Sequence, residues 1–395
     1  MLFSLALILI IGFAFSGLLN RLRLPGLLGM LATGIILGPF ALNLISSEIL
    51  SVSSELRQIA LIVILVRAGL SLHMDDLKKV GRPAILMCFI PATFELVATI
   101  ILAPIILNVS YIEAAIMGAV LAAVSPAVIV PRMLKMMESG YGKEKNIPQL
   151  ILAGASVDDV YVIVLFTTFM GMYQGSGFSP FSLVAVPVSI VTGLVVGILG
   201  GAMLTWLFKK IHMRDTIKIL IILSIAFCLV TMETAIKPYV PMSGLLAVMA
   251  LGTTILKKYA LLARRLSGKF SKIWVGAEIL LFVLVGAAVD IRFVAGASFI
   301  AVVLILSALV FRICGVYVSL LKTNLTREEK LFCAMAYLPK ATVQAAIGSI
   351  PLTAGVAAGN TILTVAVLAI LITAPMGAIA IDLSYKRLLT VGMEP

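Results

Sequence analysis

Apolar segments of about 20 residues recur from one end of the chain to the other. A segment of that length, wound into an α-helix, is long enough to cross the hydrocarbon core of a bilayer. Only 12% of the residues are charged, which is low for a soluble protein. The sequence therefore predicts an all-α polytopic membrane protein, in which residues 1–395 form one integral membrane unit without a soluble domain. Thirteen spans are expected, at about 2–19, 25–45, 54–72, 83–108, 112–134, 147–173, 181–207, 216–232, 239–256, 273–291, 293–321, 329–351 and 359–384.

The basic residues of the predicted loops are divided unequally between the two sides of the membrane. Loops on one side hold 24 of the 30 Lys and Arg residues, and loops on the other side hold only Arg57, Lys237 and Arg292. Because cytoplasmic loops are enriched in Lys and Arg, we expect an outside N-terminus and a cytoplasmic C-terminus, in the plasma membrane. This distribution accounts for the net charge of +12 without a nucleic-acid partner. The basic loop 257–272 is either an amphipathic helix on anionic lipid headgroups or a solvated connector.

The two halves of the chain resemble each other. The motif LPGLL (24–28) opens the second span, as VPMSGLL (240–246) opens the ninth, and matching positions lie roughly 213 to 217 residues apart. The expected organisation is repeat one at about 1–173, a linker helix at about 181–207 and repeat two at about 216–384. Equivalent helices are seven spans apart, an odd number, so the two repeats must have opposite orientations across the membrane.

Two spans at matching positions contain prolines near the middle of the membrane, in SPAVIVP (125–131) and LPKATVQAAIGSIP (338–351). A proline removes a backbone hydrogen bond from a helix. Freed backbone groups are tolerated at that depth only where they line a polar cavity or are buried in protein. These spans are therefore expected to be broken helices that cross near the midplane, and ordinary proline kinks are the structural alternative.

Two adjacent aspartates, Asp158 and Asp159, lie near the middle of the span at 147–173. Burial favours the protonated carboxyl and nearby cations favour the carboxylate, so such a group can bind either a proton or a small cation. Neighbouring residues on a helix point about 100° apart, so the two aspartates are expected to have different roles. Hard oxygen ligands suit Na⁺ or Li⁺, and no cofactor is expected. The further oxygen ligands are predicted to be the hydroxyls of Ser125 and Ser156 and the carbonyls of Val124 and Ala155.

Other charges deep in the spans need partners, because an unpaired charge in the bilayer is expensive. Glu95 and Arg312 occupy matching positions in the two repeats and are predicted to form an ion pair. Arg312 could instead pair with Asp158, in which case Glu95 needs another partner. An ion pair between one aspartate and Lys340 is the structural alternative to an ion site. Lys340 and Thr342, both in the second broken span, are placed among the supporting residues.

Three motifs in this order, SVDD (156–159), SPAVIVP and YLPKATVQAAIG (337–348), resemble the cation–proton antiporter superfamily. The similarity is greatest to its NHA subgroup of sodium/proton antiporters and covers essentially the whole chain, including LPGLLGMLATGIILGP (24–39) and LVRAGLSL (65–72). The resemblance implies an NhaA-like fold, a homodimer with interleaved core and dimerisation subdomains, and alternating access by elevator-like movement of the core.

The same resemblance implies that Asp159 is the principal carrier of the cation and the proton, with Asp158 as the accessory carboxylate. Electrogenic bacterial relatives carry a lysine in the span that here holds Arg312. Because arginine stays protonated far above physiological pH, it is a poor proton carrier, and with Arg312 held by Glu95 electroneutral exchange is expected.

The predicted function is therefore Na⁺(Li⁺)/H⁺ antiport, with K⁺/H⁺ antiport or a cation channel as alternatives. Organic-anion symport on a similar fold does not require an acidic pair, so SVDD argues against it. No nucleophile–base set, metal cluster or phosphate loop stands out, so an enzyme is not expected.

Overall fold

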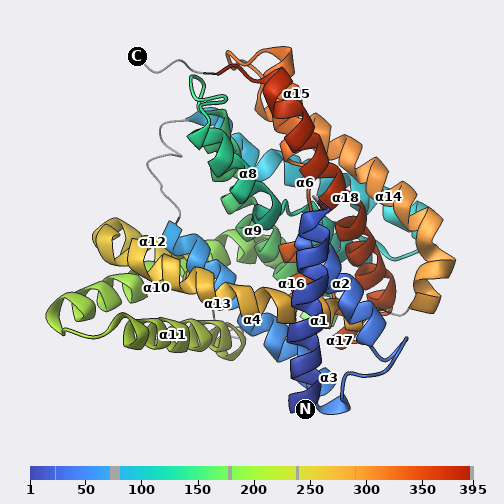
Figure 1. Ribbon diagram of the computed structural model, residues 1–395, viewed down its shortest axis with the longest axis horizontal. Helices are drawn as coiled ribbons and strands as arrows, with labels where there is room; N and C mark the ends of the chain where they lie inside the picture. Colours follow the sequence, from blue (N-terminus) through green and yellow to red (C-terminus); the bar gives the residue numbers. More distant parts are fainter. Residues whose placement is uncertain (23, 72–80, 177–179, 237–239, 290, 392–395) are drawn as a thin grey trace. The chain divides into compact units, whose positions relative to one another are not determined.

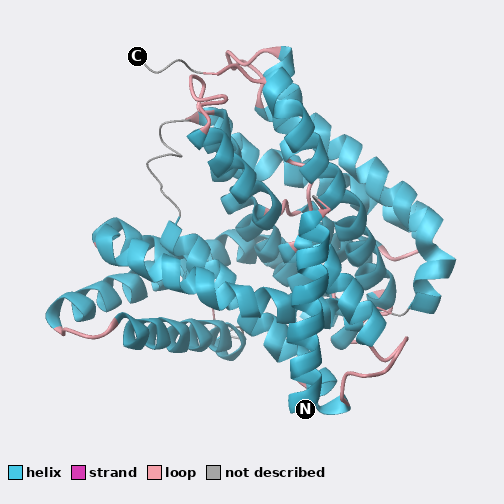
Figure 2. Ribbon diagram, viewed as in Figure 1, coloured by secondary structure: helices cyan, strands magenta, loops and turns pink. Residues whose placement is uncertain are grey.

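The chain is described by a computed structural model over residues 1–22, 24–71, 81–176, 180–236, 240–289 and 291–391 (Figure 1). At positions 126, 127, 131, 134, 138, 156, 160, 176, 180–187, 190, 234 and 291–298 only the backbone is described. Within these ranges the regular elements are helices, and no strand is present (Figure 2). The elements are α1 Leu2–Arg21, α2 Gly26–Leu37, α3 Ser47–Ser51, α4 Ser53–Ser71, α6 Arg82–Leu107, α7 Tyr111–Ala122, α8 Pro126–Glu138, α9 Ile147–Gly171, the π-helical turn η1 Met172–Ser176, α10 Pro180–Lys210, α11 Asp215–Ile236, α12 Gly244–Lys258, α13 Ala260–Ala287, α14 Ile291–Ser319, α15 Arg327–Ala336, α16 Thr342–Ile347, α17 Ile350–Thr353 and α18 Gly359–Leu388.

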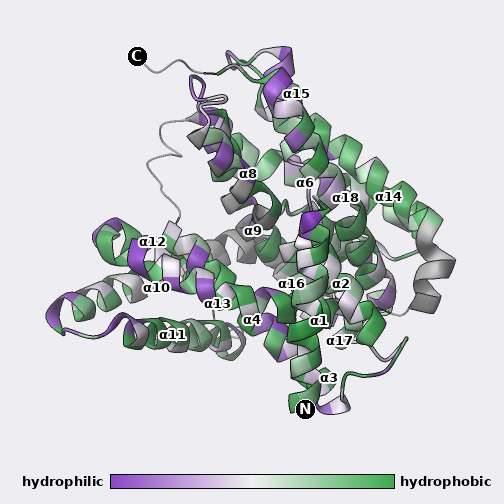
Figure 3. Ribbon diagram, in the orientation of Figure 1, coloured by the Kyte–Doolittle hydropathy of each residue, from purple (hydrophilic) through white to green (hydrophobic). Residues whose placement is uncertain are grey.

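Many of these helices have the length and composition of membrane spans. In the described part of the chain, 8 helices are long and apolar enough to cross a bilayer, and two shorter apolar helices are Gly26–Leu37 and Tyr111–Ala122. Hydrophobic residues follow the shafts of α1, α14 and α18, and hydrophilic residues gather toward helix ends and loops (Figure 3). The all-helical prediction is confirmed, whereas the count of thirteen spans stays a prediction.

The chain divides into two compact units. Unit 1 comprises Met1–Ser54, Asp75–Val162 and Ile279–Pro395, and unit 2 comprises Glu55–Met74 and Ile163–Glu278. Each unit is thus assembled from segments that are far apart in the sequence. Both aspartates of SVDD belong to unit 1.

Unit 1 contains both of the predicted broken helices. The first ends as α7 at Ala122 and resumes as α8 at Pro126, and the second ends as α15 at Ala336 and resumes as α16 at Thr342. Proline at the start of α8 lacks the N–H that a first-turn residue would leave unpaired, so it suits this position. The two breaks meet, because the Ser125 N–H donates to the Pro339 carbonyl at 2.8 Å. The prediction of broken helices is confirmed, and the alternative of simple proline kinks is wrong.

Unit 2 contains two helices, α10 and α12, that pack closely along their lengths. A Cβ atom on Gly197 of α10 would lie 2.3 Å from the Ala247 carbonyl oxygen of α12, and one on Gly201 would lie 2.6 Å from the Leu251 carbonyl oxygen. Small residues at a spacing of four allow two helix backbones to approach in a membrane protein. Glycine at these positions therefore sets the distance between α10 and α12.

The basic segment 257–272 is mostly helical. After a short junction at Tyr259, it forms the first part of the 28-residue helix α13, which continues without interruption to Ala287. Leu262, Leu266 and Phe270 are fully buried at a spacing of four, while Arg264 and Arg265 are exposed. This amphipathic spacing explains the helix. The segment is therefore an amphipathic helix, and contact of its exposed basic face with anionic lipid stays a prediction.

Candidate functional site

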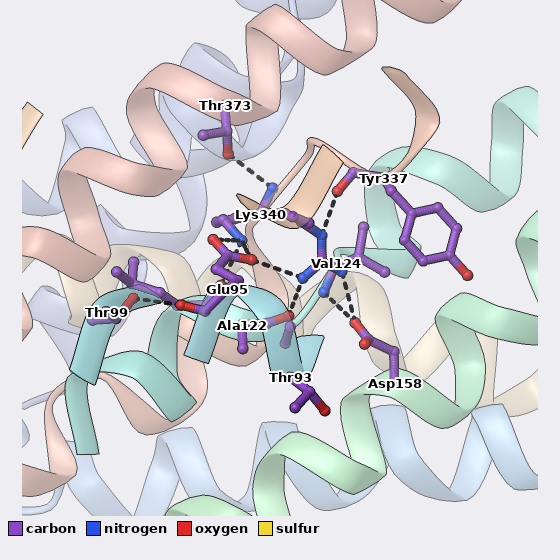
Figure 4. Close-up of polar contacts among 12 residues, drawn as sticks. Thr93, Glu95, Thr99, Ala122, Val124, Asp158, Tyr337, Lys340 and Thr373 are labelled. Atoms are coloured by element: carbon purple, nitrogen blue, oxygen red, sulfur yellow. Dashed lines mark hydrogen bonds and ion pairs between the residues drawn. The ribbon is translucent and has the colours of Figure 1, made fainter. Parts of the chain in front are cut away.

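A buried cluster of charged side chains lies where the two breaks meet (Figure 4). Glu95 comes from α6, Arg312 from α14, Asp158 from α9, and Lys340 from the break before α16. The helices α6 and α14 pack against each other within unit 1, which brings the first two together. The members Glu95, Asp158, Arg312 and Lys340 each have a relative exposure of 0%.

Glu95 accepts from both cations of the cluster. The Nη1 atom of Arg312 lies 2.8 Å from Glu95 Oε2, which confirms the predicted ion pair. The Lys340 ammonium donates to the same oxygen at 2.8 Å and lies 2.7 Å from Oε1. Lys340 is thus paired with Glu95, and the alternative in which Lys340 neutralises an aspartate is not what the structure shows.

Asp158 is held by a cation and a backbone amide. Its Oδ2 atom accepts from Arg312 Nη2 at 3.0 Å and from the Val124 N–H at 2.9 Å. Arg312 therefore joins Glu95 and Asp158 together, so the two pairings that the sequence left as alternatives both occur. Charge-assisted hydrogen bonds of this kind fix geometry as well as charge.

The positive side chains also cap the ends of the half-helices. Arg312 donates through Nε to the Tyr337 carbonyl at 2.8 Å and through Nη1 to the Ala122 carbonyl. Lys340 donates to the Leu121 carbonyl at 2.5 Å. These carbonyls lie at the C-terminal ends of α15 and α7, where helices leave acceptors unpaired and carry a partial negative charge. The cluster thus satisfies the backbone groups that the breaks expose.

Asp159, the neighbour of Asp158, is engaged differently. Its side chain is buried at 9% relative exposure. Among the described residues its Oδ1 atom has no hydrogen-bond partner, and no ion pair to it is present there. The Ser125 hydroxyl in the adjacent break is likewise buried without a partner in the described part of the chain. Free buried oxygens at a helix break are the chemistry that a small hard cation requires.

The remaining predicted residues are placed as follows. Val124 contributes its amide to Asp158, whereas the prediction concerned its carbonyl, which stays untested. Ala155 is buried within the uninterrupted helix α9, and in a regular helix its carbonyl accepts from the Asp159 N–H. Thr342 is buried at the start of α16. The side chain of Ser156 lies outside the described residues.

Sequence reasoning missed two polar side chains of the cluster. Gln344 donates through Nε2 to the carbonyls of Ala123 at 2.8 Å and Leu121 at 3.3 Å. The Thr373 hydroxyl of α18 accepts the Lys340 N–H at 2.9 Å (Figure 4). Gln344 lies inside the motif YLPKATVQAAIG, and Thr373 lies 215 positions after Asp158, within the range of the repeat offset. Both signals were present in the sequence.

Comparison with known proteins identifies the family. The family of transmembrane sodium/hydrogen exchangers matches residues 5–382. The chain is 34% identical to sodium/hydrogen exchanger 9B2 of Mus musculus over 379 residues, which is 93% of this chain and 69% of that protein. It is 32% identical to sodium/hydrogen exchanger 9B1 of Homo sapiens over 389 residues, 94% of this chain and 74% of that protein.

The fold is that of a solved antiporter. The structure of the sodium proton antiporter MjNhaP1 from Methanocaldococcus jannaschii at pH 8 superposes with a TM-score of 0.86 at 20% identity, over 97% of each chain. The apolar helices and the family match together show an integral membrane protein of the cation–proton antiporter superfamily. The chain belongs to the sodium/hydrogen exchanger family.

Proposed function

We propose that this protein is a secondary active antiporter that exchanges Na⁺ or Li⁺ for H⁺, with Asp159 binding the two ions in turn. The observation that carries the proposal is the difference between the two adjacent carboxyls. Asp158 is committed to Arg312 and the Val124 amide, whereas Asp159 has a buried Oδ1 atom without a partner in the described residues. Asp159 is thus the carboxyl to which an incoming cation or proton can bind, and Asp158 is the accessory group.

The charges of the cluster support an exchange of one cation for one proton. Glu95, Asp158 and Asp159 supply three negative charges, and Arg312 and Lys340 supply two positive charges. When all five groups are ionised, the four-residue cluster is neutral and Asp159 gives the whole site one net negative charge. One Na⁺ or one H⁺ at Asp159 makes the site neutral, and a neutral site crosses a membrane at far lower energy than a charged one. Electroneutral exchange follows from this count.

Na⁺ is the transported substrate in this proposal, and oxygen atoms near the break supply its ligands. The carboxylates of Asp159 and Asp158 and the hydroxyl of Ser125 are the main candidates, because each has a buried oxygen without a partner in the described part of the chain. The remaining candidate ligands are the Ser156 hydroxyl and the carbonyls of Val124 and Ala155.

Alternating access by two inverted repeats, with thirteen spans in all, completes the proposal. It is supported by two contacts that recur at equivalent positions. In the first half of the chain, the Val124 amide at the break donates to Asp158 on α9 at 2.9 Å. In the second half, the Lys340 amide at the break donates to Thr373 on α18, also at 2.9 Å. Helices related in this way are typical of transporters in which one bundle moves against the other. An elevator-like movement of the unit that carries the aspartates fits this pattern.

The topology and partners follow from the distribution of charge and from the relatives' family. We propose a plasma-membrane homodimer with an outside N-terminus and a cytoplasmic C-terminus, because the basic loops gather on one side. The exposed arginines at the start of α13 suit anionic lipid headgroups.

The test is cation-driven proton flux in proteoliposomes that contain the purified protein. The vesicle interior is made acidic, a pH dye reports proton exit, and Na⁺, Li⁺ or K⁺ is added separately. The expected result is proton exit with Na⁺ and Li⁺ that is abolished in Asp159→Asn. The apparent KM for Na⁺ should rise as the pH falls, because protons compete for the same carboxyl. The control is Glu144→Gln, which removes a carboxylate from an exposed loop position.

Each other outcome has a distinct meaning. Proton exit with K⁺ alone assigns the protein to K⁺/H⁺ antiport. An ionic current that persists without a proton gradient indicates a channel. Unchanged flux in a folded Asp159→Asn variant contradicts the role given to that carboxyl.

A further inference from the structure

Two glutamates far from the ion site, Glu113 and Glu329, begin the two broken helices in the same way. In each helix, a hydroxyl residue at the N-cap and the glutamate three positions later form a reciprocal capping box, Ser110 with Glu113 on α7 and Thr326 with Glu329 on α15. The two boxes are 216 positions apart, which lies within the repeat offset. Such a box satisfies the unpaired amides of the first turn. A capping box is complete without any contact to another segment of the chain.

Glu113 makes a second contact that a capping box does not require. Its Oε2 atom accepts the Ser110 N–H at 2.9 Å and the Ser110 hydroxyl at 2.7 Å. Its Oε1 atom accepts the Ala358 N–H at 2.8 Å, across 245 positions of sequence. Ala358 is the N-cap residue of α18. The buried glutamate thus ties the start of α7 to the start of α18.

Glu329 makes the corresponding contact in the other half. Its Oε2 atom accepts the Thr326 N–H at 2.7 Å and the Lys145 ammonium at 2.8 Å. Lys145 lies two residues before α9 begins at Ile147. The Glu329 side chain is 4% exposed and that of Lys145 is 34% exposed. This glutamate ties the start of α15 to the start of α9, and Lys145 lies 213 positions before Ala358.

From these two matching ties we infer that Glu113 and Glu329 are positioning residues for ion binding. This inference rests on the proposed antiport function. Each glutamate joins a broken helix of one half to the unbroken helix that follows the break in the other half. Those unbroken helices carry polar side chains of the site, Asp158 and Asp159 on α9 and Thr373 on α18. In the proposed topology the two ties lie on opposite faces of the membrane.

The ties act at a distance along rigid helices. Asp158 is eleven residues into α9, about 17 Å from its first residue at 1.5 Å per residue. Near its middle α9 is held by Val124 and Arg312, and at its start by the Lys145–Glu329 pair. Contacts at both places fix the direction of α9, whereas contacts near its middle alone would leave its start free to tilt. Loss of the tie therefore alters the distance from the aspartates to the break, which changes cation affinity more than the rate of transport.

The experiment compares Lys145→Gln, Glu329→Gln and Glu113→Gln with the wild type in proteoliposomes. A partly exposed ion pair is worth an equilibrium factor of about five, so we expect the apparent KM for Na⁺ to rise about fivefold in Lys145→Gln and Glu329→Gln. In Glu113→Gln one carboxylate oxygen becomes an amide nitrogen, so the side chain cannot accept from both Ser110 and Ala358, and the loss of one hydrogen bond should raise the KM by about the same factor. The maximal rate should stay within about twofold of the wild type. Lys145→Arg keeps the pair and should keep the wild-type KM. Glu328→Gln is the matched control, because Glu328 is the exposed neighbour of Glu329 in the same turn.

A second measurement is independent of transport. Amide hydrogen exchange should become faster at the start of α9 in Lys145→Gln and Glu329→Gln, and at the start of α18 in Glu113→Gln, because a released helix end opens more often. Unchanged exchange, or unchanged KM in folded variants, contradicts the inference and leaves the antiport proposal intact. A wild-type protein without cation-driven flux contradicts the antiport proposal, and the exchange measurement then decides whether the ties exist.

Discussion

Glu95 is the acceptor on which both buried cations converge, so its charge should contribute strongly to stability. Arg312 and Lys340 each lie 2.8 Å from its Oε2 atom, and all three side chains are fully buried. In the variant Glu95→Gln, Arg312 keeps Asp158 as an anionic partner, but Lys340 keeps no carboxylate among the described residues. Removing one partner of a buried ion pair destabilises a protein by about 3–5 kcal/mol.

The assay is thermal unfolding of the purified protein in detergent, followed by the loss of the monodisperse peak. At about 2 °C per kcal/mol, the Tm of Glu95→Gln should fall by about 6–10 °C. The control is Glu144→Gln, which removes the same charge from an exposed loop position of the same unit.

A double variant separates the loss of charge pairing from the loss of packing. In Glu95→Gln with Lys340→Met, the unpaired ammonium is gone, so part of the lost stability should return. If Glu95→Gln unfolds within about 1 °C of the wild type, the pairing contributes little and this reasoning is refuted. If the double variant is less stable than Glu95→Gln, Lys340 is stabilised by its carbonyl contacts and not by Glu95.

Two further variants test the backbone contacts of each unit. Thr373→Val keeps the side-chain shape but leaves the buried Lys340 N–H without its acceptor, so the free energy of unfolding should fall by about 1–3 kcal/mol. Thr373→Ser keeps the hydroxyl and should be close to the wild type in the same thermal assay. Equal losses in both variants would contradict the hydrogen-bond account. Gly197→Ala places a Cβ atom 2.3 Å from the Ala247 carbonyl oxygen and should lower the free energy of unfolding by about 1–3 kcal/mol. Gly200→Ala, whose Cβ atom would lie 3.6 Å from a Leu251 methyl group, should be tolerated. Equal Tm values for the two variants would show that α10 and α12 can separate freely.

The sequence was sufficient to predict the broken helices and the ion pair between Glu95 and Arg312. Proline in an apolar run has a local physical effect, and equivalent positions in a repeat have equivalent depths. The partner of Lys340 could not be predicted, because Glu95, Asp158 and Asp159 all lie at a suitable depth and only the three-dimensional packing places Glu95 beside the Lys340 ammonium.

The ends of helices were predicted less well than their centres. The segment 257–272 was expected to separate two spans, as either an amphipathic helix or a solvated connector, yet α13 begins at Ala260 and runs through it into the next span. Basic residues mark the level of the headgroups, but a helix can continue past that level when its other face is apolar, as the buried Leu262 and Leu266 show. Charge therefore indicates depth in the membrane and does not indicate where the backbone changes conformation.

The guanidinium of Arg312 connects four other segments of the chain. It donates to Glu95 on α6, to Asp158 on α9, and to carbonyls at the ends of α7 and α15. The group is planar, and its five N–H donors have a fixed geometry set by covalent bonds. Hydrogen bonds from this one rigid group therefore bring the four segments together at a single point. Asp159, the residue that follows Asp158 on α9, thus lies directly beside a junction at which one side chain holds four segments of the chain.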